Sequence, residues 1–239
     1  MRYLKVRFNL FTILIASGLA LGLYLLHVQG IKPANWGLFA TLILLLSLTW
    51  LYRWSQAATA TSKEITLVAA LAAVAAVGRV PFAALPSVQP TTFLVIASGY
   101  VFGPQAGFIV GATAALVSNF FLGQGPWTPW QMMGWGLIGC SSAWLKYFWP
   151  RISRWAIAFF AGVSGFVFGW IQNLGFWLVY IQPLTLKTFL TAYAASLSFD
   201  LVHAASNAFL CILFFPAVIK ILEDYQQRLH HSYSDQSSM

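Results

Sequence analysis

The stretch Ser118-Asn119-Phe120-Phe121-Leu122-Gly123-Gln124-Gly125-Pro126-Trp127-Thr128-Pro129-Trp130-Gln131 ends one apolar segment of the chain and begins the next. It places amides, hydroxyls and tryptophans at the ends of segments that are otherwise apolar. The shorter stretch Val88-Gln89-Pro90-Thr91-Thr92 does the same at the start of an earlier segment. Polar side chains beside lipid are costly unless they face protein, water or a ligand. We therefore expect these polar groups to form a binding pocket.

The composition of the 239-residue chain is that of an integral membrane protein. Hydrophobic residues make up 59% and charged residues 8%, whereas a soluble domain carries about 25% charged residues. The mean hydropathy is +0.75. The acidic residues are Glu64, Asp200, Glu223, Asp224 and Asp235, a set that argues against catalysis by paired carboxylates. Cys140 and Cys211 lie in apolar runs without metal-ligand spacing, so we expect no metal and no cofactor.

The apolar segments predict an all-α fold with about eight transmembrane helices, since each span needs about 20 apolar residues. They lie at 10–27, 36–54, 65–80, 91–103, 106–122, 129–148, 155–181 and 196–222. A small, polar stretch at 55–64 separates the first two from the rest. This pattern predicts an N-terminal two-helix hairpin and linker (1–62), a six-helix core (63–224) and a polar, disordered cytoplasmic tail (225–239).

The basic residues predict an orientation in which both termini are cytoplasmic. The cytoplasmic side would then hold Arg2, Lys5, Arg7, Arg53, Lys63, Lys146, Arg151, Arg154, Lys220 and Arg228, and the outer side Lys32, Arg79 and Lys187. This follows the positive-inside rule. The net charge of +8 is thus mainly a topology signal, and nothing in it favours nucleic acid as a partner.

Three rows of small residues predict close contacts between membrane helices. One row is Gly103, Gly107, Gly111 and Ala115, and another is Ala161, Gly165 and Gly169; we interpret both as internal packing. The third is an alanine face formed by Ala69, Ala72, Ala73 and Ala76. That face is smooth enough for docking against a separate protein, and internal packing is the alternative.

The last apolar segment carries a polar stripe. Ser196, Asp200, His203 and Asn207 follow one another at spacings of four, three and four, so they share one helical face. An acid, an imidazole and an amide aligned in a membrane helix indicate a functional site. The alternative is a structural cluster in which Asp200 pairs with Arg79.

The quoted stretch also contains a predicted capping box, with Thr128 as N-cap, Pro129 at N1 and Gln131 at N3. Such a box would give Gln131 a structural role. Even so, Trp127, Gln131 and Trp135 share a face, and Trp130 is adjacent. Interfacial tryptophans often serve only as membrane anchors, but their convergence beside 123–126 indicates a flat binding wall. Asn119, Asn173 and Gln172 would add amides at a similar depth.

The common motifs of nucleotide and hydrolytic chemistry are absent from the sequence. It contains no G-x-x-x-x-G-K-[ST], no H-E-x-x-H and no G-x-S-x-G. If the protein moves a ligand, the energy must come from a partner or from a gradient. Asp200 is the single carboxylate expected within the membrane, which leaves little for ion coupling.

The region 63–222 resembles a substrate-binding S component of the energy-coupling factor (ECF) vitamin transporters. The resemblance rests on the alanine face, Gly78-Arg79-Val80-Pro81, Gln89-Pro90-Thr91-Thr92, Phe102-Gly103-Pro104-Gln105-Ala106-Gly107 and the run 118–131. It implies a six-helix membrane protein of a prokaryotic plasma membrane that captures a vitamin from outside. It also implies docking through the alanine face onto a transmembrane coupling subunit driven by two ATPases. Residues 1–62 depart from the six-helix pattern.

The run Gln124-Gly125-Pro126-Trp127-Thr128-Pro129-Trp130-Gln131 most resembles the S components associated with cobalamin or related corrinoids. Neutral amides and tryptophans outnumber charges there, which suits a bulky ligand with amide arms. Thiamine would favour acidic partners and a carboxylated vitamin a cationic one, an option that Arg79 leaves open. The expected substrate-binding residues are Arg79, Gln89, Thr91, Thr92, Asn119, Gln124, Trp127, Trp130, Gln131, Trp135, Asn173, Asp200, His203 and Asn207.

Two rival functions stay open at this point. The first is a membrane enzyme that acts on a lipid-like substrate through Asp200 and His203. The second is an interaction scaffold whose tryptophans serve only as membrane anchors. We expect a transporter subunit without catalysis of its own.

Overall fold

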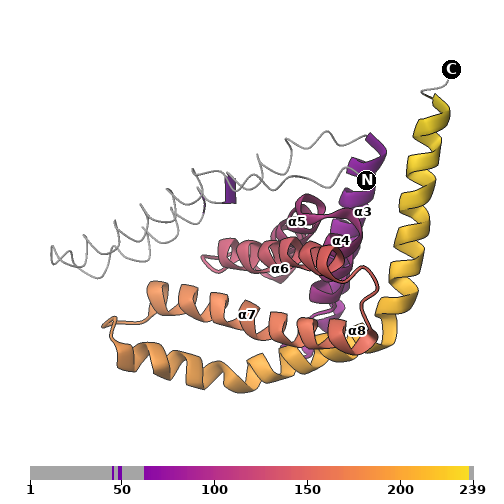
Figure 1. The fold of residues 1–239 in the computed structure, drawn as a ribbon. Helices are drawn as coiled ribbons and strands as arrows, with labels where there is room; N and C mark the ends of the chain where they lie inside the picture. The colour runs from indigo at the N-terminus through magenta and orange to yellow at the C-terminus, as the bar shows by residue number, and fades with distance from the viewer. Residues whose placement is uncertain (1–44, 46–47, 50–61, 237–239) are drawn as a thin grey trace, which may run out of the picture.

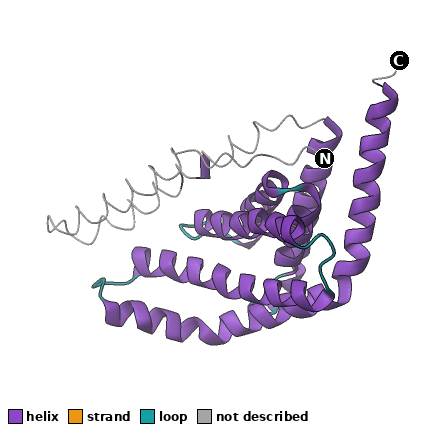
Figure 2. Ribbon diagram, in the orientation of Figure 1, coloured by secondary structure: helices purple, strands orange, loops and turns teal. Residues whose placement is uncertain are grey.

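The computed structural model describes residues 62–236, together with 45, 48 and 49, and side chains as far as 228. These residues form helices and connecting loops without a strand, as Figure 2 shows, so the all-α prediction is confirmed for them. The predicted segments 10–27 and 36–54 lie almost entirely outside the described residues. The hairpin, and with it the total of eight helices, stays a prediction.

The six-helix core follows the predicted order (Figure 1). Its elements are α3 (Ser62–Arg79), the short 3₁₀ helix η2 (Pro81–Ala84), α4 (Pro90–Phe102), α5 (Pro104–Leu122), α6 (Thr128–Phe148), α7 (Arg154–Tyr180) and α8 (Leu186–Gln236). Prolines stand in the first turns of α4, α5 and α6, where a missing N–H costs nothing. Gly103 and Gly123 end α4 and α5 with φ of 94° and 104°, a region that favours glycine.

Four helical stretches of the described part of the chain are long and apolar enough to cross a membrane. They are Lys63–Ala84, Pro104–Leu122, Arg154–Tyr180 and Leu186–Arg228. The apolar helix Pro90–Phe102 is shorter. Helix α6 has 21 residues, but it is rich in tryptophan, glycine and serine rather than in aliphatic side chains.

Helix α8 corrects the prediction at both of its ends. We expected a span over 196–222 and a disordered tail, but the helix begins at Leu186 and continues to Gln236. Neither 186–195 nor 225–236 contains a glycine or a proline, so nothing in these stretches interrupts the helix. Pro216 lies inside α8. It removes a backbone hydrogen bond there, which accounts for the bend of α8 in Figure 1.

The part of α8 beyond the bend is fastened to the ends of two other helices. Lys146 of α6 forms an ion pair with Glu223. Gln226 Nε2 donates to the carbonyl oxygen of Val101 at 2.9 Å. These contacts fix the direction in which the end of α8 leaves the bundle.

Glycines let three helices cross at close range. A Cβ atom added at Gly107 of α5 would lie 2.3 Å from the carbonyl oxygen of Gly139 in α6, and one at Gly99 of α4 would lie 1.9 Å from the same atom. A Cβ at Gly111 would lie 2.4 Å from the carbonyl oxygen of Trp135. The packing role of the glycine row is therefore confirmed for Gly107 and Gly111. Gly103 does not share it, because it has open space around it and serves the turn.

Helices α7 and α8 lie side by side, as Figure 1 shows, and pack through the second row of small residues. A Cβ at Gly165 would lie 2.7 Å from Cα of Ala204, and one at Gly169 would lie 2.0 Å from Oδ1 of Asp200. Ala161 is fully buried. The packing interpretation of this row is confirmed.

The alanine face of α3 is divided between the core and the surface. Ala72 and Ala76 are 2% and 1% exposed, whereas Ala69 and Ala73 are exposed. The expectation that all four meet a partner is wrong for Ala72 and Ala76, because α3 turns them towards α4 and α5. Ala69 and Ala73 remain available at the surface.

Candidate functional site

Arg79 is the centre of a buried polar network at one end of the bundle. Its Nε donates to Oε1 of Gln89 at 3.0 Å, and its Nη1 donates to Oγ of Ser118 at 2.8 Å and to Oδ1 of Asn119 at 2.7 Å. The guanidinium also lies over the ring of Trp135, 4.9 Å from the centroid. A buried cation is thus held by neutral acceptors and an aromatic face rather than by a carboxylate.

The network continues from α5 into α6 through Asn119. Its Nδ2 donates to Oγ1 of Thr128 at 2.9 Å and to Oε1 of Gln131 at 2.8 Å. Thr128 donates in turn to Oε1 of Gln124 at 2.9 Å. The predicted capping box is therefore wrong: Trp127 is the N-cap, no side chain caps the helix there, and Gln131 turns towards Asn119 instead of back to the helix start.

A second arm of the network runs to α8. Trp135 Nε1 donates to Oγ1 of Thr92 at 2.9 Å, and that oxygen lies 3.2 Å from Nε2 of His203. His203 Nδ1 lies 2.9 Å from the carbonyl oxygen of Ser87. Because a carbonyl only accepts, Nδ1 carries a proton and donates it to Ser87. His203 thereby links α8 to the loop before α4.

Asp200 belongs to a separate cluster. Its Oδ2 accepts from Oγ of Ser196 at 3.0 Å and from Nδ2 of Asn173 at 3.4 Å. The alternative in which Asp200 pairs with Arg79 is wrong, because Arg79 reaches towards α5 instead. The hydrogen bonds of Asp200 and His203 within the described residues lead to different partners, so the two do not form an acid–imidazole pair.

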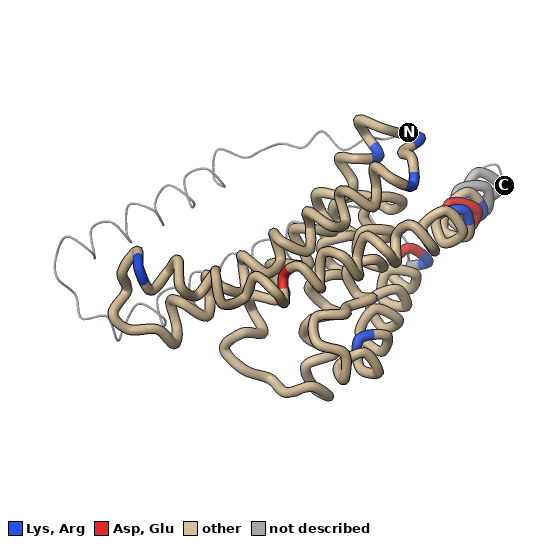
Figure 3. The backbone as a smooth tube through the Cα atoms, turned by 90° about the horizontal axis from the view of Figure 1, so that it is seen from below, with Lys and Arg blue, Asp and Glu red and all other residues tan. Residues whose placement is uncertain are grey.

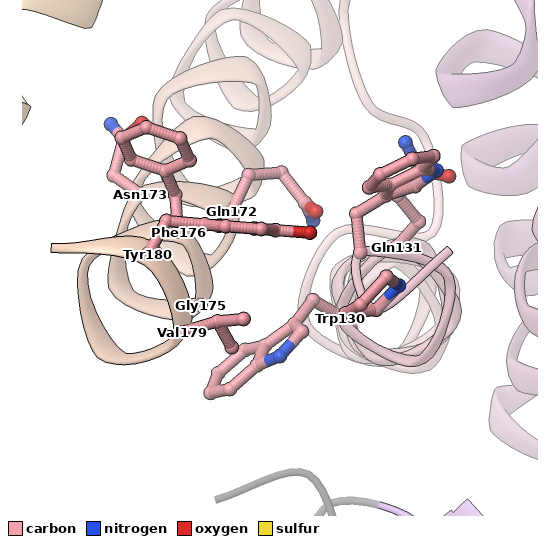
Figure 4. A pocket seen from close by; sticks show the side chains of 10 residues that line it. Trp130, Gln131, Gln172, Asn173, Gly175, Phe176, Val179 and Tyr180 are labelled. Carbon is pink, nitrogen blue, oxygen red and sulfur yellow. The ribbon is translucent and has the colours of Figure 1, made fainter. Parts of the chain in front are cut away.

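Two open clefts meet at Gln172 and Asn173 of α7. Cleft 1, of about 290 Å³, lies between the beginning of α6 and the end of α7. Its lining residues are Pro126, Trp127, Trp130, Gln131, Gln172, Asn173, Gly175, Phe176, Val179 and Tyr180. In Figure 4, Trp130 and Gln131 stand on one side, and Gln172, Phe176 and Tyr180 on the other. Four of the ten lining residues are aromatic, and none is charged.

Cleft 2, of about 280 Å³, lies between the loop before α4 and helices α7 and α8. Its lining residues are Ser87, Gln89, Phe168, Gly169, Gln172, Asn173, Ser196, Phe199, Asp200 and His203. It contains the acid, the imidazole and the serine of the polar stripe. The two clefts thus differ in chemistry: cleft 1 is aromatic and neutral, and cleft 2 carries a carboxylate.

A family model described as the substrate-specific component of ECF transporters matches residues 63–218. The chain belongs to this family. No curated protein and no solved structure matches the chain. As an S component the chain is a membrane transporter subunit, and membership implies association with an ECF module and a small-molecule substrate.

The predicted binding residues of this S component fall into groups. Those that line a cleft are Gln89, Trp127, Trp130, Gln131, Asn173, Asp200 and His203. Those in the network behind the clefts are Arg79, Thr92, Asn119, Gln124 and Trp135. Thr91 bonds to the carbonyl oxygen of Ala75. Asn207 is fully buried, and both of its amide atoms lack a partner among the described residues. A ligand contact at any of these residues stays a prediction.

Phe176 and Tyr180 of α7 line cleft 1 but were not predicted, and Gln172, noted in the sequence for its amide, lines it with them. Gln172, Phe176 and Tyr180 follow one another at intervals of four, so they share a helical face. That spacing was readable in the sequence. Among the described residues, no group of histidine, cysteine, aspartate or glutamate is arranged to hold a metal ion.

Proposed function

We propose that this S component captures a vitamin or related micronutrient from the outer side of the membrane for an ATP-driven importer. The observation that carries the proposal is the pair of open clefts that share Gln172 and Asn173. Polar groups converge there in a chain that is 59% hydrophobic. Polar groups inside membrane segments typically mark a substrate site. Family membership supports the same function.

Cobalamin or a related corrinoid is the substrate that we propose first. The run 124–131, which resembles the corrinoid branch of the family, supplies Trp127, Trp130 and Gln131 to cleft 1. Ligand pockets for drug-sized molecules occupy about 300–1,000 Å³. Cleft 1, at about 290 Å³, is too small for a whole corrinoid. Such a ligand would extend over both clefts around Gln172 and Asn173.

Native mass spectrometry of the purified chain with an equimolar vitamin panel, including cobalamin and cobinamide, tests this function. We expect one retained adduct, and its mass names the substrate. An adduct of another vitamin would refute the corrinoid assignment and keep the capture function. The absence of any adduct would count against capture itself.

We further propose that a transmembrane coupling subunit docks on Ala69 and Ala73, and that two partner ATPases supply the energy. Both alanines are exposed on α3, and small residues let a partner helix approach closely. Replacing each by tryptophan should abolish vitamin uptake in cells and leave ligand binding unchanged. Ala195→Trp, at an exposed position of α8, is the matched control and should keep uptake. Normal uptake by the α3 variants would refute the docking site.

We propose that the protein lies in a prokaryotic plasma membrane with both termini in the cytoplasm. In Figure 3, the Lys and Arg residues of the described part gather mainly towards the end of the molecule that carries the C-terminus. The positive-inside rule assigns such an end to the cytoplasm. Cysteine labelling from either side of the membrane, at position 187 and at position 220, would test this orientation.

A further inference from the structure

We propose that cleft 1 is a subsite for an uncharged, planar group whose edge carries hydrogen-bond acceptors, such as a ring carbonyl or a carboxamide. The inference rests on the proposed function, which is the capture of a small molecule. It goes further by stating which chemistry one part of that molecule must have.

Two buried hydrogen-bond donors of cleft 1 have no partner among the described residues. They are Nε1 of Trp130 and Nε2 of Gln172. Trp130 is 8% exposed, and its indole N–H can only donate. An unpaired buried donor costs about 1–3 kcal/mol. The two belong to facing helices, α6 and α7, and line the same cleft. Acceptors on a ligand would satisfy these donors, whereas a ligand donor would satisfy neither of them.

Both donors are held in place by close packing against glycines of the opposite helix. A Cβ atom added at Gly175 of α7 would lie 2.6 Å from the ring of Trp130. One added at Gly134 of α6 would lie 3.3 Å from Nε2 of Gln172. Each side chain therefore lies against the backbone of the other helix, as Figure 4 shows for Trp130 beside Gly175. The donors are positioned before any ligand arrives.

The walls of cleft 1 indicate that the bound group is flat and uncharged. Trp127, Trp130, Phe176 and Tyr180 supply aromatic surface, which favours stacking against another ring. The described residues that line the cleft include no charged side chain. A ligand carboxylate or phosphate would thus be desolvated there without a countercharge, at a high cost in free energy. Neutral acceptors avoid this cost.

Lumichrome, an uncharged tricyclic ring with two carbonyl groups, is a suitable probe. The full chain in lipid nanodiscs would be dialysed against lumichrome, with empty nanodiscs subtracted, and binding followed by the fluorescence of the probe. We expect saturable binding that Trp130→Phe weakens about tenfold, the effect of losing about 1.4 kcal/mol from one hydrogen bond. Trp170→Phe, at an exposed position of α7 outside both clefts, is the matched control and should bind as the unaltered protein does.

A second measurement separates the lost N–H from lost packing. In protein labelled with ¹⁵N-tryptophan, the indole signal that is missing from Trp130→Phe belongs to Trp130. Lumichrome should shift this signal and slow its exchange with solvent. A Trp130 signal unmoved at saturation would overturn the inference, as would equal binding by Trp130→Phe.

The outcomes also distinguish this inference from the proposed function. If a panel vitamin is retained but lumichrome does not bind, the capture function stands and the assignment of cleft 1 falls. If neither the panel nor lumichrome binds, both fall. Saturable lumichrome binding that depends on Trp130 supports both.

Discussion

The two sides of helix α6 show two different uses of polar and small residues. Towards α5, Gly139 packs directly on Gly107, and the side chains of Asn119, Thr128 and Gln131 are joined by hydrogen bonds. Towards α7, the helices separate into cleft 1, and the donors of Trp130 and Gln172 have no partner among the described residues. The polar groups named on the α5 side have hydrogen-bond partners, whereas the two donors on the α7 side have none among the described residues.

This difference separates polar groups that serve the fold from those that await a ligand. Trp130 and Gln131 are neighbours in the sequence, about 100° apart around the helix. Gln131 also reaches the wall of cleft 1, but its Oε1 already accepts from Asn119. Whether a side chain already has a hydrogen-bond partner indicates its role better than its residue type or its position does.

The largest expected effect comes from disturbing the close-packed side. Gly107→Ala should lower the free energy of unfolding by about 4 kcal/mol, above the usual cost of overpacking, because the new methyl group meets backbone atoms of two helices. Thermal melting in nanodiscs would measure it. Gly162→Ala is the matched control, since its Cβ would lie 3.7 Å from the nearest atom, an ordinary contact. Equal melting temperatures for the two variants would contradict the close crossing of α5 and α6.

A smaller loss is expected from removing the cation of the network. Arg79→Met should lower the free energy of unfolding by about 3 kcal/mol, because Gln89, Ser118 and Asn119 all lose a charged donor. Lys146→Met is the control. It breaks a partly exposed ion pair with Glu223, worth less than about 1 kcal/mol. If both variants melt alike, the network contributes little and Arg79 is free to serve a ligand.

The positions of the core helices were largely predictable, because prolines and glycines mark their boundaries. Pro90, Pro104 and Pro129 lie in the first turns of their helices, and Gly103 and Gly123 end two of them. The end of α8 was not predicted, because the polar composition of this stretch suggested disorder. The absence of helix-breaking residues was the better indicator of its structure. The polar residues of 225–236 include neither glycine nor proline.

The faces of the helices were harder to predict, since lipid and protein neighbours are equally apolar. Ala69, Ala72, Ala73 and Ala76 share a broad face, but the boundary of the core divides it. For the same reason the directions of the Arg79 and Asp200 side chains could not be predicted. Arg79 turns to α5, and Asp200 turns to Asn173 of α7.

The sharpest test of the comparison replaces one glutamine on each side of α6 by methionine. Without ligand, Gln131→Met should lower the free energy of unfolding by about 1 kcal/mol, because Nδ2 of Asn119 loses an acceptor. Gln172→Met removes an amide nitrogen that has no partner among the described residues. It should leave stability unchanged or raise it by up to about 1 kcal/mol.

The sign of the change in unfolding free energy decides this test, so a small change is sufficient. Each variant is the control for the other, since both exchange the same amide for the same thioether in the same bundle. Thermal melting of the unliganded variants in nanodiscs would measure both. A loss of stability in Gln172→Met would mean that the Gln172 amide stabilises the fold. Only one of the two unpaired donors, that of Trp130, would then be left for a ligand in cleft 1. A gain of stability would mean that the buried amide of Gln172 destabilises the unliganded protein. Ligand binding is the physical reason for retaining such a group.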